Sequence, residues 1–331
     1  MSLAASQYCS AQDLQVGFYA NKCIERSGFL GIFSRKYDVE RIVADKVRDA
    51  YYSSKYRNIV PALLRLQFHD CFVYGCDASI LLDGPETEKN APPNLSVRGY
   101  DLIDDIKDEI EKICPGIVSC ADIIAMATRD AISLAALRSS REEPFRYDVE
   151  TGRRDGIVSR GSDIVDLPPP TATASNSIKA FQKKGLTATD MVYLLGGHSV
   201  GVTHCNVIED RLSNFNDTGR PDSTMNQDLV ESLNEYCARN PTGQVSLDQG
   251  TPSIVDNSFY KQSLYWNKGI LKVDQDIVFN EETRRTVVEL ARDTYKQFNV
   301  KFWQAMVKLQ RVGVLTYPQG EIRQSCARRV S

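Results

Sequence analysis

This 331-residue chain has no surplus of basic charge and no long apolar segment. Its 40 Lys and Arg residues against 43 Asp and Glu residues give a formal net charge of −3. A chain without a basic field has little attraction for nucleic acid or for an anionic membrane, so neither is expected as a partner. No apolar run approaches the ~18 residues of a membrane-spanning helix, so no membrane span is expected.

Histidine is scarce, and the cysteines form no C-x-x-C pair. With only three histidines, His69, His198 and His204, a zinc site is disfavoured. Scattered cysteines in an enzyme-sized chain instead favour disulfides and an oxidising compartment. The nine are Cys9, Cys23, Cys71, Cys76, Cys114, Cys120, Cys205, Cys237 and Cys326.

The first eleven residues are too short in apolar content to be a complete secretory leader. Cys9-Ser10-Ala11 before Gln12 resembles the small-residue end of a cleavage site. We interpret residues 1–11 as a leader remnant behind a few added residues or, alternatively, as a native tail. Cys9 is then the odd cysteine. Residues 12–331 are expected to form a single domain, since no repeat, low-complexity tract or linker divides them.

The spacing of apolar residues predicts a mostly α fold with few and short strands. Thr187 followed by Asp190 at the third position predicts the start of one helix, which runs to Gly196-Gly197. Other helices are predicted at residues 38–51, 58–69, 100–113, 119–137, 226–239, 258–267, 281–299 and 301–312.

Arg65 and His69 stand four residues apart in one predicted helix, with Phe68 beside them. Side chains at i and i+4 leave the same helix face, so a fixed cation and a titratable base can meet over one small ligand. Such a pair is more often a surface feature than a catalytic one, and its spacing alone decides nothing.

The residues that follow carry many oxygen ligands. Carboxylate, carbonyl and hydroxyl oxygens occur within ten residues at Asp70, Val73, Gly75, Asp77 and Ser79. Calcium favours a set made only of oxygen ligands. Cys71 and Cys76 can close a small disulfide loop that shapes this segment in advance. The alternative is an Asp-rich turn without an ion.

His198 follows the predicted helix and the Gly196-Gly197 pair, which permits close approach of another group. A histidine at the inner end of such a helix fits haem ligation. The alternative is a core histidine with its hydrogen bonds satisfied, and we assign His204 to that class.

Two segments resemble the signatures of the secretory plant haem peroxidases of class III. Residues 64–83 are similar to the distal signature and residues 190–205 to the proximal one, and the resemblance spans about residues 12–330. It implies a mostly α fold of about ten or more helices, with haem b between distal and proximal halves. It also implies a secreted monomer of the cell wall, apoplast or vacuole. Gln67 departs from the pattern, in which His is usual.

On the distal side, the resemblance implies that Arg65 and His69 cleave peroxide and that Phe68 walls the haem site. Asn94 would fix the tautomer of His69, and Glu88 would support Asn94. On the proximal side, His198 would be the axial haem ligand and Asp274 would accept its hydrogen bond. Pro168 would lie where phenolic donors dock. Some relatives carry Phe at the position of Leu247.

The resemblance further implies two calcium ions and four disulfides. The distal calcium would take the oxygen set named above, and the proximal calcium would take Ser199, Asp248, Thr251, the Ile254 carbonyl and Asp256. The disulfides would be Cys23–Cys114, Cys71–Cys76, Cys120–Cys326 and Cys205–Cys237. Of the two N-glycosylation sequons, Asn216 is the expected glycan site, because Asn94 would be buried.

The implied activity is reduction of hydrogen peroxide coupled to one-electron oxidation of phenols, including lignin precursors. One alternative is a peroxidase-like protein that binds wall polysaccharide or calcium without turnover. Another is a cytosolic ascorbate-type peroxidase, which the disulfides and calcium loops disfavour. Such enzymes often carry Trp near the axial ligand, whereas the only tryptophans here are Trp266 and Trp303. Residues 25–37 are interpreted as an inserted loop without function, and residues 138–147 also depart from the family.

Overall fold

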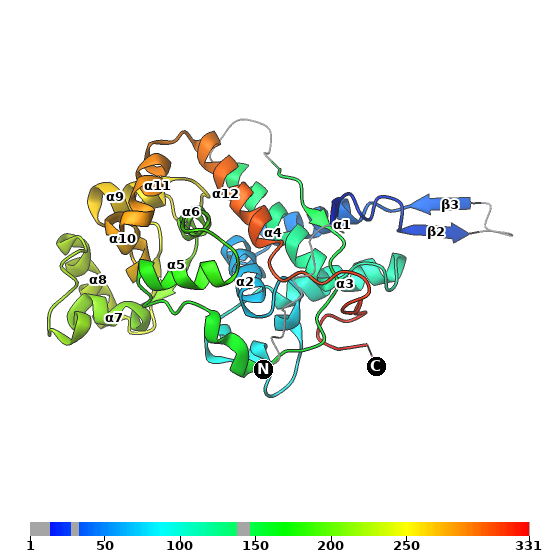
Figure 1. Ribbon diagram of the computed structural model, residues 1–331, viewed down its shortest axis with the longest axis horizontal. Coiled ribbons are helices and arrows are strands. Elements are labelled where there is room, and N and C mark those ends of the chain that lie inside the picture. The colour runs from blue at the N-terminus through cyan, green and yellow to red at the C-terminus, as the bar shows by residue number, and fades with distance from the viewer. Residues whose placement is uncertain (1–13, 28–32, 138–145, 331) are drawn as a thin grey trace, which may run out of the picture. The chain divides into compact units, whose positions relative to one another are not determined.

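A computed structural model describes residues 14–27, 33–137 and 146–330 (Figure 1). The expectations for residues 1–11, Cys9 included, and for most of residues 138–147 lie outside these ranges. The predicted mostly α fold is confirmed, since the described strands form only three two-stranded sheets. The chain divides into two compact units. The first unit comprises residues 1–134, 145–167 and 307–331, and the second comprises residues 135–144 and 168–306.

The first unit contains the helices α1 (Val39–Tyr52), α2 (Ile59–Val73), α3 (Tyr100–Ile113) and most of α4 (Cys120–Leu137). Four short 3₁₀ turns join them: η3 (Ser79–Leu81), η4 (Glu88–Asn90), η5 (Pro92–Asn94) and η6 (Gly161–Asp166). Its two sheets are antiparallel and pair β1 (Gln15–Val16) with β4 (Glu150–Thr151), and β2 (Ile24–Ser27) with β3 (Phe33–Lys36).

The second unit holds α5 (Ala174–Lys183), α6 (Ala188–Leu194), α7 (Cys205–Ser213), α8 (Gln227–Arg239), α9 (Ser258–Trp266), α10 (Lys272–Phe279), α11 (Glu281–Arg292) and most of α12 (Tyr295–Leu309). Short turns occur at η7 (Leu195–Ser199) and η8 (Phe215–Asp217). Its sheet pairs β5 (Val202–His204) with β6 (Gln244–Ser246) in antiparallel register.

Helix α2 is largely buried within the first unit, since eleven of its fifteen residues are buried. A helix that is apolar nearly all round must be surrounded by other elements rather than lie on a surface. Of its polar residues, Gln67, His69 and Asp70 are buried, whereas Arg65 is exposed. This is the helix that carries Arg65 and His69.

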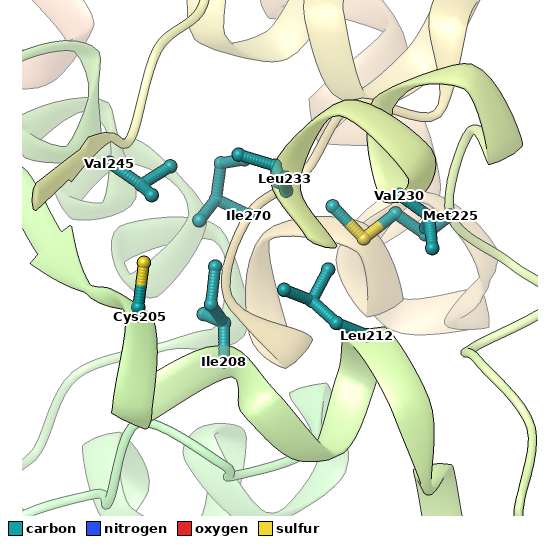
Figure 2. Packing of buried hydrophobic residues seen from close by; sticks show 8 residues of the cluster. All are labelled: Cys205, Ile208, Leu212, Met225, Val230, Leu233, Val245 and Ile270. Atoms are coloured by element: carbon teal, nitrogen blue, oxygen red, sulfur yellow. The ribbon is translucent and has the colours of Figure 1, made fainter. Parts of the chain in front are cut away.

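Helices α7 and α8 of the second unit enclose a small apolar core together with β6 and the segment before α10. Figure 2 shows its side chains converging from these elements. The partly buried Leu247 packs against the same cluster, which comprises Cys205, Ile208, Leu212, Met225, Val230, Leu233, Val245 and Ile270. This packing holds the end of the β5–β6 sheet in place beside η7.

The prediction of one continuous helix at residues 281–299 is wrong, because the structure divides this segment between α11 and α12. Thr294 and Gln297 form a reciprocal cap: Gln297 N donates to Thr294 Oγ1 at 3.3 Å, and Thr294 N donates to Gln297 Oε1 at 3.0 Å. A cap of this kind satisfies backbone donors that are otherwise left unpaired at a helix start. The helices α5, α7 and α10 were not predicted.

The insertion at residues 25–37 is not simply a loop. Residues on either side of its centre pair as β2 and β3, with Ile24 opposite Lys36 and Glu25 opposite Arg35 (Figure 1). Pairing of the facing backbone groups of these two strands gives the insert local β structure. Residues 28–32 lie outside the described ranges.

Eight cysteines form the four disulfides that the resemblance implies: Cys23–Cys114, Cys71–Cys76, Cys120–Cys326 and Cys205–Cys237. The first three lie within the first unit and the fourth joins α7 to α8 in the second. Each one constrains the unfolded chain and is expected to stabilise the fold by about 2–4 kcal/mol.

Gly75 and Gly313 lie back to back at the edge of the segment that contains the expected distal calcium ligands. A Cβ on Gly313 would lie 2.5 Å from the carbonyl oxygen of Tyr74, at a φ of +56°. Gly185 has a similar φ of +76° but no atom within 4 Å of such a Cβ.

We therefore expect Gly313→Ala to destabilise the fold more than Gly185→Ala. The control carries only the left-handed backbone cost of about 1–2 kcal/mol. Gly313→Ala adds a steric cost of about 1–3 kcal/mol, because the clash is with backbone that must move. Urea unfolding of both variants measures the difference, and equal losses would contradict the steric argument.

Candidate active site

His69 is held on both ring nitrogens. Its Nδ1 lies 2.5 Å from Asn94 Oδ1, and Arg65 Nε donates to its Nε2 at 3.2 Å. Asn94 Nδ2 donates to the backbone carbonyl of Glu88 at 2.8 Å, which orients the amide oxygen toward the imidazole. Because that oxygen can only accept, Nδ1 must carry the proton and Nε2 must carry the lone pair. The arrangement leaves Nε2 as the basic atom.

The surroundings of His69 disfavour its charged form. Burial, followed by the positive charge of Arg65, lowers the pKa of His69 to about 4, against the opposing effect of the Asn94 hydrogen bond. A lowered pKa means that the neutral imidazole predominates at every pH above that value. His69 is thus available as a proton acceptor across the physiological range.

Arg65 is anchored by the segment that also carries Asn94. Its Nη1 donates to Ser96 Oγ at 3.0 Å, and its Nη2 donates to the Pro93 carbonyl at 2.9 Å. These contacts were not predicted, although both partners flank Asn94 in the sequence. They leave the guanidinium charged and fixed beside His69, since arginine does not lose its proton in proteins.

Phe68 and Glu88 complete the distal residues that the sequence indicated. The half-buried Phe68 ring lies 5.9 Å from the His69 ring and 4.2 Å from Phe72, as an apolar wall beside the base. Glu88 contacts Asn94 through its backbone carbonyl, not through its side chain. Both carboxylate oxygens of Glu88 are buried without a hydrogen bond, and burial raises its pKa to about 8.

His198 lies in the second unit on η7, directly after α6. Thr187 and Asp190 form the capping box that the sequence predicted at the start of α6. His198 Nδ1 donates to Asp274 Oδ1 at 2.8 Å, and the other oxygen of this fully buried carboxylate accepts from Leu271 N at 3.0 Å. Among the described residues, nothing donates to or accepts from His198 Nε2, which leaves that nitrogen available as a ligand.

The ring that contacts His198 is Phe259, a residue that the sequence reasoning missed. The two rings are 5.9 Å apart and edge to face, and Phe259 is buried. The helical period of residues 258–267 would have placed Phe259 on the buried face. Leu247 instead packs against the apolar cluster of α7 and α8. His204 is partly exposed rather than in the core, with its Nε2 3.4 Å from Gln244 Nε2.

The expected distal calcium ligands lie in one buried stretch of the first unit. Asp70 accepts from Ala78 N at 3.0 Å, and Asp77 accepts from Ser79 N at 3.0 Å. Burial raises the pKa of both carboxyl groups, that of Asp77 to about 6. Ser79 Oγ is buried and has no partner, and the Gly75 carbonyl accepts from Asp77 N at 2.8 Å.

The expected proximal set gathers in a loop of the second unit. Thr251 Oγ1 donates to Asp256 Oδ1 at 3.0 Å and lies 3.4 Å from Asp248 Oδ2. A β-bridge between Val200 and Ser253 brings the residue after Ser199 against this loop. The Thr251 carbonyl accepts from Ile254 N at 3.0 Å.

Within the described ranges, no three or more His, Cys, Asp or Glu side chains are grouped as metal ligands. Each expected calcium set contains only two carboxylates, and its other ligands are hydroxyl and carbonyl oxygens. Clustering of His, Cys, Asp and Glu side chains therefore does not test the two calcium sites, which stay predictions.

Pro168, expected to border the donor site, is half exposed shortly after η6, and its role also stays a prediction.

Comparison with known proteins shows which family this chain belongs to. The sequence profile of the peroxidase family matches residues 43–293. Peroxidase 60 of Arabidopsis thaliana is 45% identical over 318 residues, which cover 95% of this chain and 89% of that protein. This chain belongs to the plant class III peroxidase family.

Two further members of the family show the same extent of similarity. Peroxidase 57 of Arabidopsis thaliana is 42% identical and matches over 95% of this chain and 92% of its own length. Peroxidase N1 of Nicotiana tabacum is 38% identical over 96% of this chain and 90% of its own length. Membership makes the chain a peroxidase, an oxidoreductase that uses hydrogen peroxide as the acceptor of electrons.

The bond between Asn94 and His69 predicts different effects for two substitutions. Asn94→Ala removes the acceptor that fixes the tautomer, and we expect the reaction with peroxide to slow by about 10–100-fold, as for other groups that orient an imidazole. Asn94→Asp keeps an acceptor but adds a negative charge, which raises the pKa of His69. The acidic limb of its rate profile should therefore move to higher pH.

Stopped-flow measurement of the peroxide reaction from pH 3 to 8 distinguishes the two variants. Asn90→Ala, on the exposed side of the same segment, is the control and should behave as the wild type. Unchanged rates and profiles in both Asn94 variants would show that the bond does not govern His69.

Proposed function

We propose that this peroxidase holds haem b, reduces hydrogen peroxide and oxidises small phenolic donors such as monolignols in one-electron steps. The observation that carries the proposal is the geometry around His69, in which one nitrogen is fixed as a donor and the other is left basic beside a fixed cation. A structural or binding role requires no such combination.

The residues of the second unit fit the axial side of a haem. His198 offers Nε2 as a ligand while its Nδ1 donates to the buried Asp274 carboxylate. That hydrogen bond fixes the tautomer and makes the imidazole a stronger electron donor. Phe259 adds an apolar contact to the same ring. The haem, when bound, supplies the redox chemistry, and the protein supplies orientation and electrostatics.

The residues of the first unit divide the work of cleaving the peroxide bond. His69 Nε2 accepts the proton of the hydroperoxide and then delivers it to the oxygen that leaves as water. Positioned proton transfer of this kind commonly contributes ~10²–10⁴-fold to a rate. Arg65, held by Ser96 and Pro93, stabilises the negative charge that develops as the bond breaks.

Two calcium ions fit the buried oxygen ligands. Asp70 and Asp77 are both buried, and burial raises the pKa of each carboxyl group, with the charge of Asp77 adding to the effect on Asp70. Ser79 Oγ and the Glu88 oxygens lack partners in the same region. A divalent cation bound by Asp70, Val73, Gly75, Asp77 and Ser79 would offset this desolvation. The loop with Asp248 and Asp256 would hold the second ion.

Family membership supports the proposal of phenolic donors, and the disulfides support the proposal of secretion. Pro168 is the residue expected to border the donor site. The four disulfides are consistent with folding in the secretory pathway. None of the described helices is long and apolar enough to cross a membrane. Asn216, the expected glycan site, is exposed in η8, whereas Asn94 is 1% exposed.

Replacing the base should abolish peroxide cleavage without loss of haem. We expect His69→Ala to slow the reaction with peroxide by about 10²–10⁴-fold, because no other group accepts the proton at that position. His204→Ala is the matched control, since among the described residues the His204 ring has a polar contact only with Gln244, which lies outside the proposed site. Stopped-flow rates at equal Soret absorbance test this, and fast cleavage by the His69 variant would refute the assignment.

Removal of calcium should destabilise the protein. Two ions held at 100 times their dissociation constants would each contribute about 2.7 kcal/mol to the folded state. We expect chelation with EGTA to lower the melting temperature and calcium, but not magnesium, to restore it. Atomic emission of the purified protein should show two calcium ions per chain. A chelated protein with an unchanged melting temperature would contradict the proposed sites.

A further inference from the structure

An exposed aromatic pair ends helix α9. Tyr265 and Trp266 are 51% and 49% exposed, and their rings lie edge to face with centroids 6.0 Å apart. The other tryptophan, Trp303, is only 3% exposed. Exposed aromatic residues are common on protein surfaces and need no function. What distinguishes Trp266 is its connection to His198.

Helix α9 links the indole to the ring that contacts His198. Phe259 and Trp266 are seven residues apart, so they lie on nearly the same helix face, two turns or about 10 Å along the axis. Phe259 is buried against His198 at 5.9 Å. The same helix therefore has one end at the expected axial ligand and the other end at the surface.

Hydrogen bonds give a second connection between the same two places. Asn267, joined to Trp266 by one peptide bond, accepts from Gln275 Nε2 at 3.2 Å. Gln275 is fully buried and adjoins Asp274, the carboxylate that His198 contacts at 2.8 Å. Gln275 is fixed at both ends of its amide, because its Nε2 also donates to Ser263 O and its Oε1 accepts from Gly269 N.

This continuity matters because electrons pass through covalent and hydrogen bonds far more readily than across gaps. Of the side chains along this route, tryptophan and tyrosine are the most easily oxidised by one electron. An oxidising equivalent generated next to His198 can thus be reduced by an electron from Trp266. All residues of the route lie within the second unit.

We propose that Trp266 is a second site of donor oxidation, at which phenolic polymers too large for the donor site proposed at Pro168 give up electrons. The proposal rests on the proposed function, because peroxide and the haem generate the oxidising equivalent. The indole loses one electron and releases its Nε1 proton to water. It regains an electron and a proton from a phenol hydroxyl of the polymer, which becomes a phenoxyl radical. Two such events reduce one hydrogen peroxide to two water molecules.

A pair of donors that differ only in size tests the proposal. Tyramine and tyramine grafted onto dextran present the same phenol, but the grafted form is macromolecular. With haem-loaded, calcium-loaded enzyme and peroxide, we expect Trp266→Phe to oxidise free tyramine as the wild type does. Its oxidation of the grafted form should fall about tenfold, equivalent to about 1.4 kcal/mol. Trp266→Tyr, which restores an oxidisable ring, should recover most of that rate.

Tyr236→Phe is the matched control, since Tyr236 is 38% exposed on α8 in the same unit but ends no such route. The second measurement does not use turnover. The wild type is treated with peroxide and a nitroso spin trap without donor, and its peptides are analysed by mass spectrometry. We expect an adduct on Trp266, and none at that position in Trp266→Phe or in enzyme without peroxide.

Each outcome decides one question. Equal oxidation of grafted tyramine by the wild type and Trp266→Phe, or adducts that form only at other residues, would overturn the second site. Failure of the haem-loaded wild type to oxidise free tyramine would instead overturn the proposed function. An effect as large in Tyr236→Phe as in Trp266→Phe would assign the loss to the surface in general, and not to Trp266.

Discussion

The burial of helix α2 is the constraint on which the distal site depends. A helix surrounded on nearly all sides can carry a base and a cation only if every polar atom is held by a partner. His69 meets this condition through Asn94 and Arg65, and Ser96 and Pro93 hold the exposed Arg65 in place. The same burial that makes these partners necessary also keeps the imidazole neutral. Exclusion of water and the neutral state of the His69 imidazole therefore have one origin.

His69 and His198 are each oriented by a hydrogen bond from Nδ1, but the two acceptors differ in charge. Each uses Nδ1 to contact a side-chain oxygen, which leaves Nε2 directed elsewhere. For His69 the oxygen belongs to a neutral amide, so the ring stays a modest base that can take and return a proton. For His198 it belongs to a carboxylate, which pushes electron density into the ring and suits it to bind a metal. The charge of the partner thus distinguishes the environments of the two imidazoles.

The sequence predicted the parts of the fold that depend on local signals. Apolar spacing located α2, α3 and α4, and the Thr187–Asp190 box located the start of α6. It missed the division at Thr294, where a single polar cap outweighs a continuous apolar pattern. It also missed the pairing of β2 with β3, because strand pairing depends on residues that face each other across the chain.

For the site, the resemblance indicated which residues matter, and the structure added how they are held. Glu88 was expected to support Asn94, and the contact is made by its backbone carbonyl and not by its carboxylate. No sequence pattern separates these two, since both come from the same residue. Phe259 was missed because a phenylalanine in an amphipathic helix resembles ordinary core. Its role depends on which helix packs against η7, a property of the tertiary fold.

The burial of Asn94 has a consequence for biosynthesis. Asn94-Leu95-Ser96 is a glycosylation sequon, yet the folded protein leaves only 1% of Asn94 exposed and commits its side chain to His69 and Glu88. A sugar on that nitrogen and an assembled distal site exclude each other. In a compartment that glycosylates nascent chains, folding of the η5 segment competes with the transferase for one side chain. Every active molecule is then one in which folding came first.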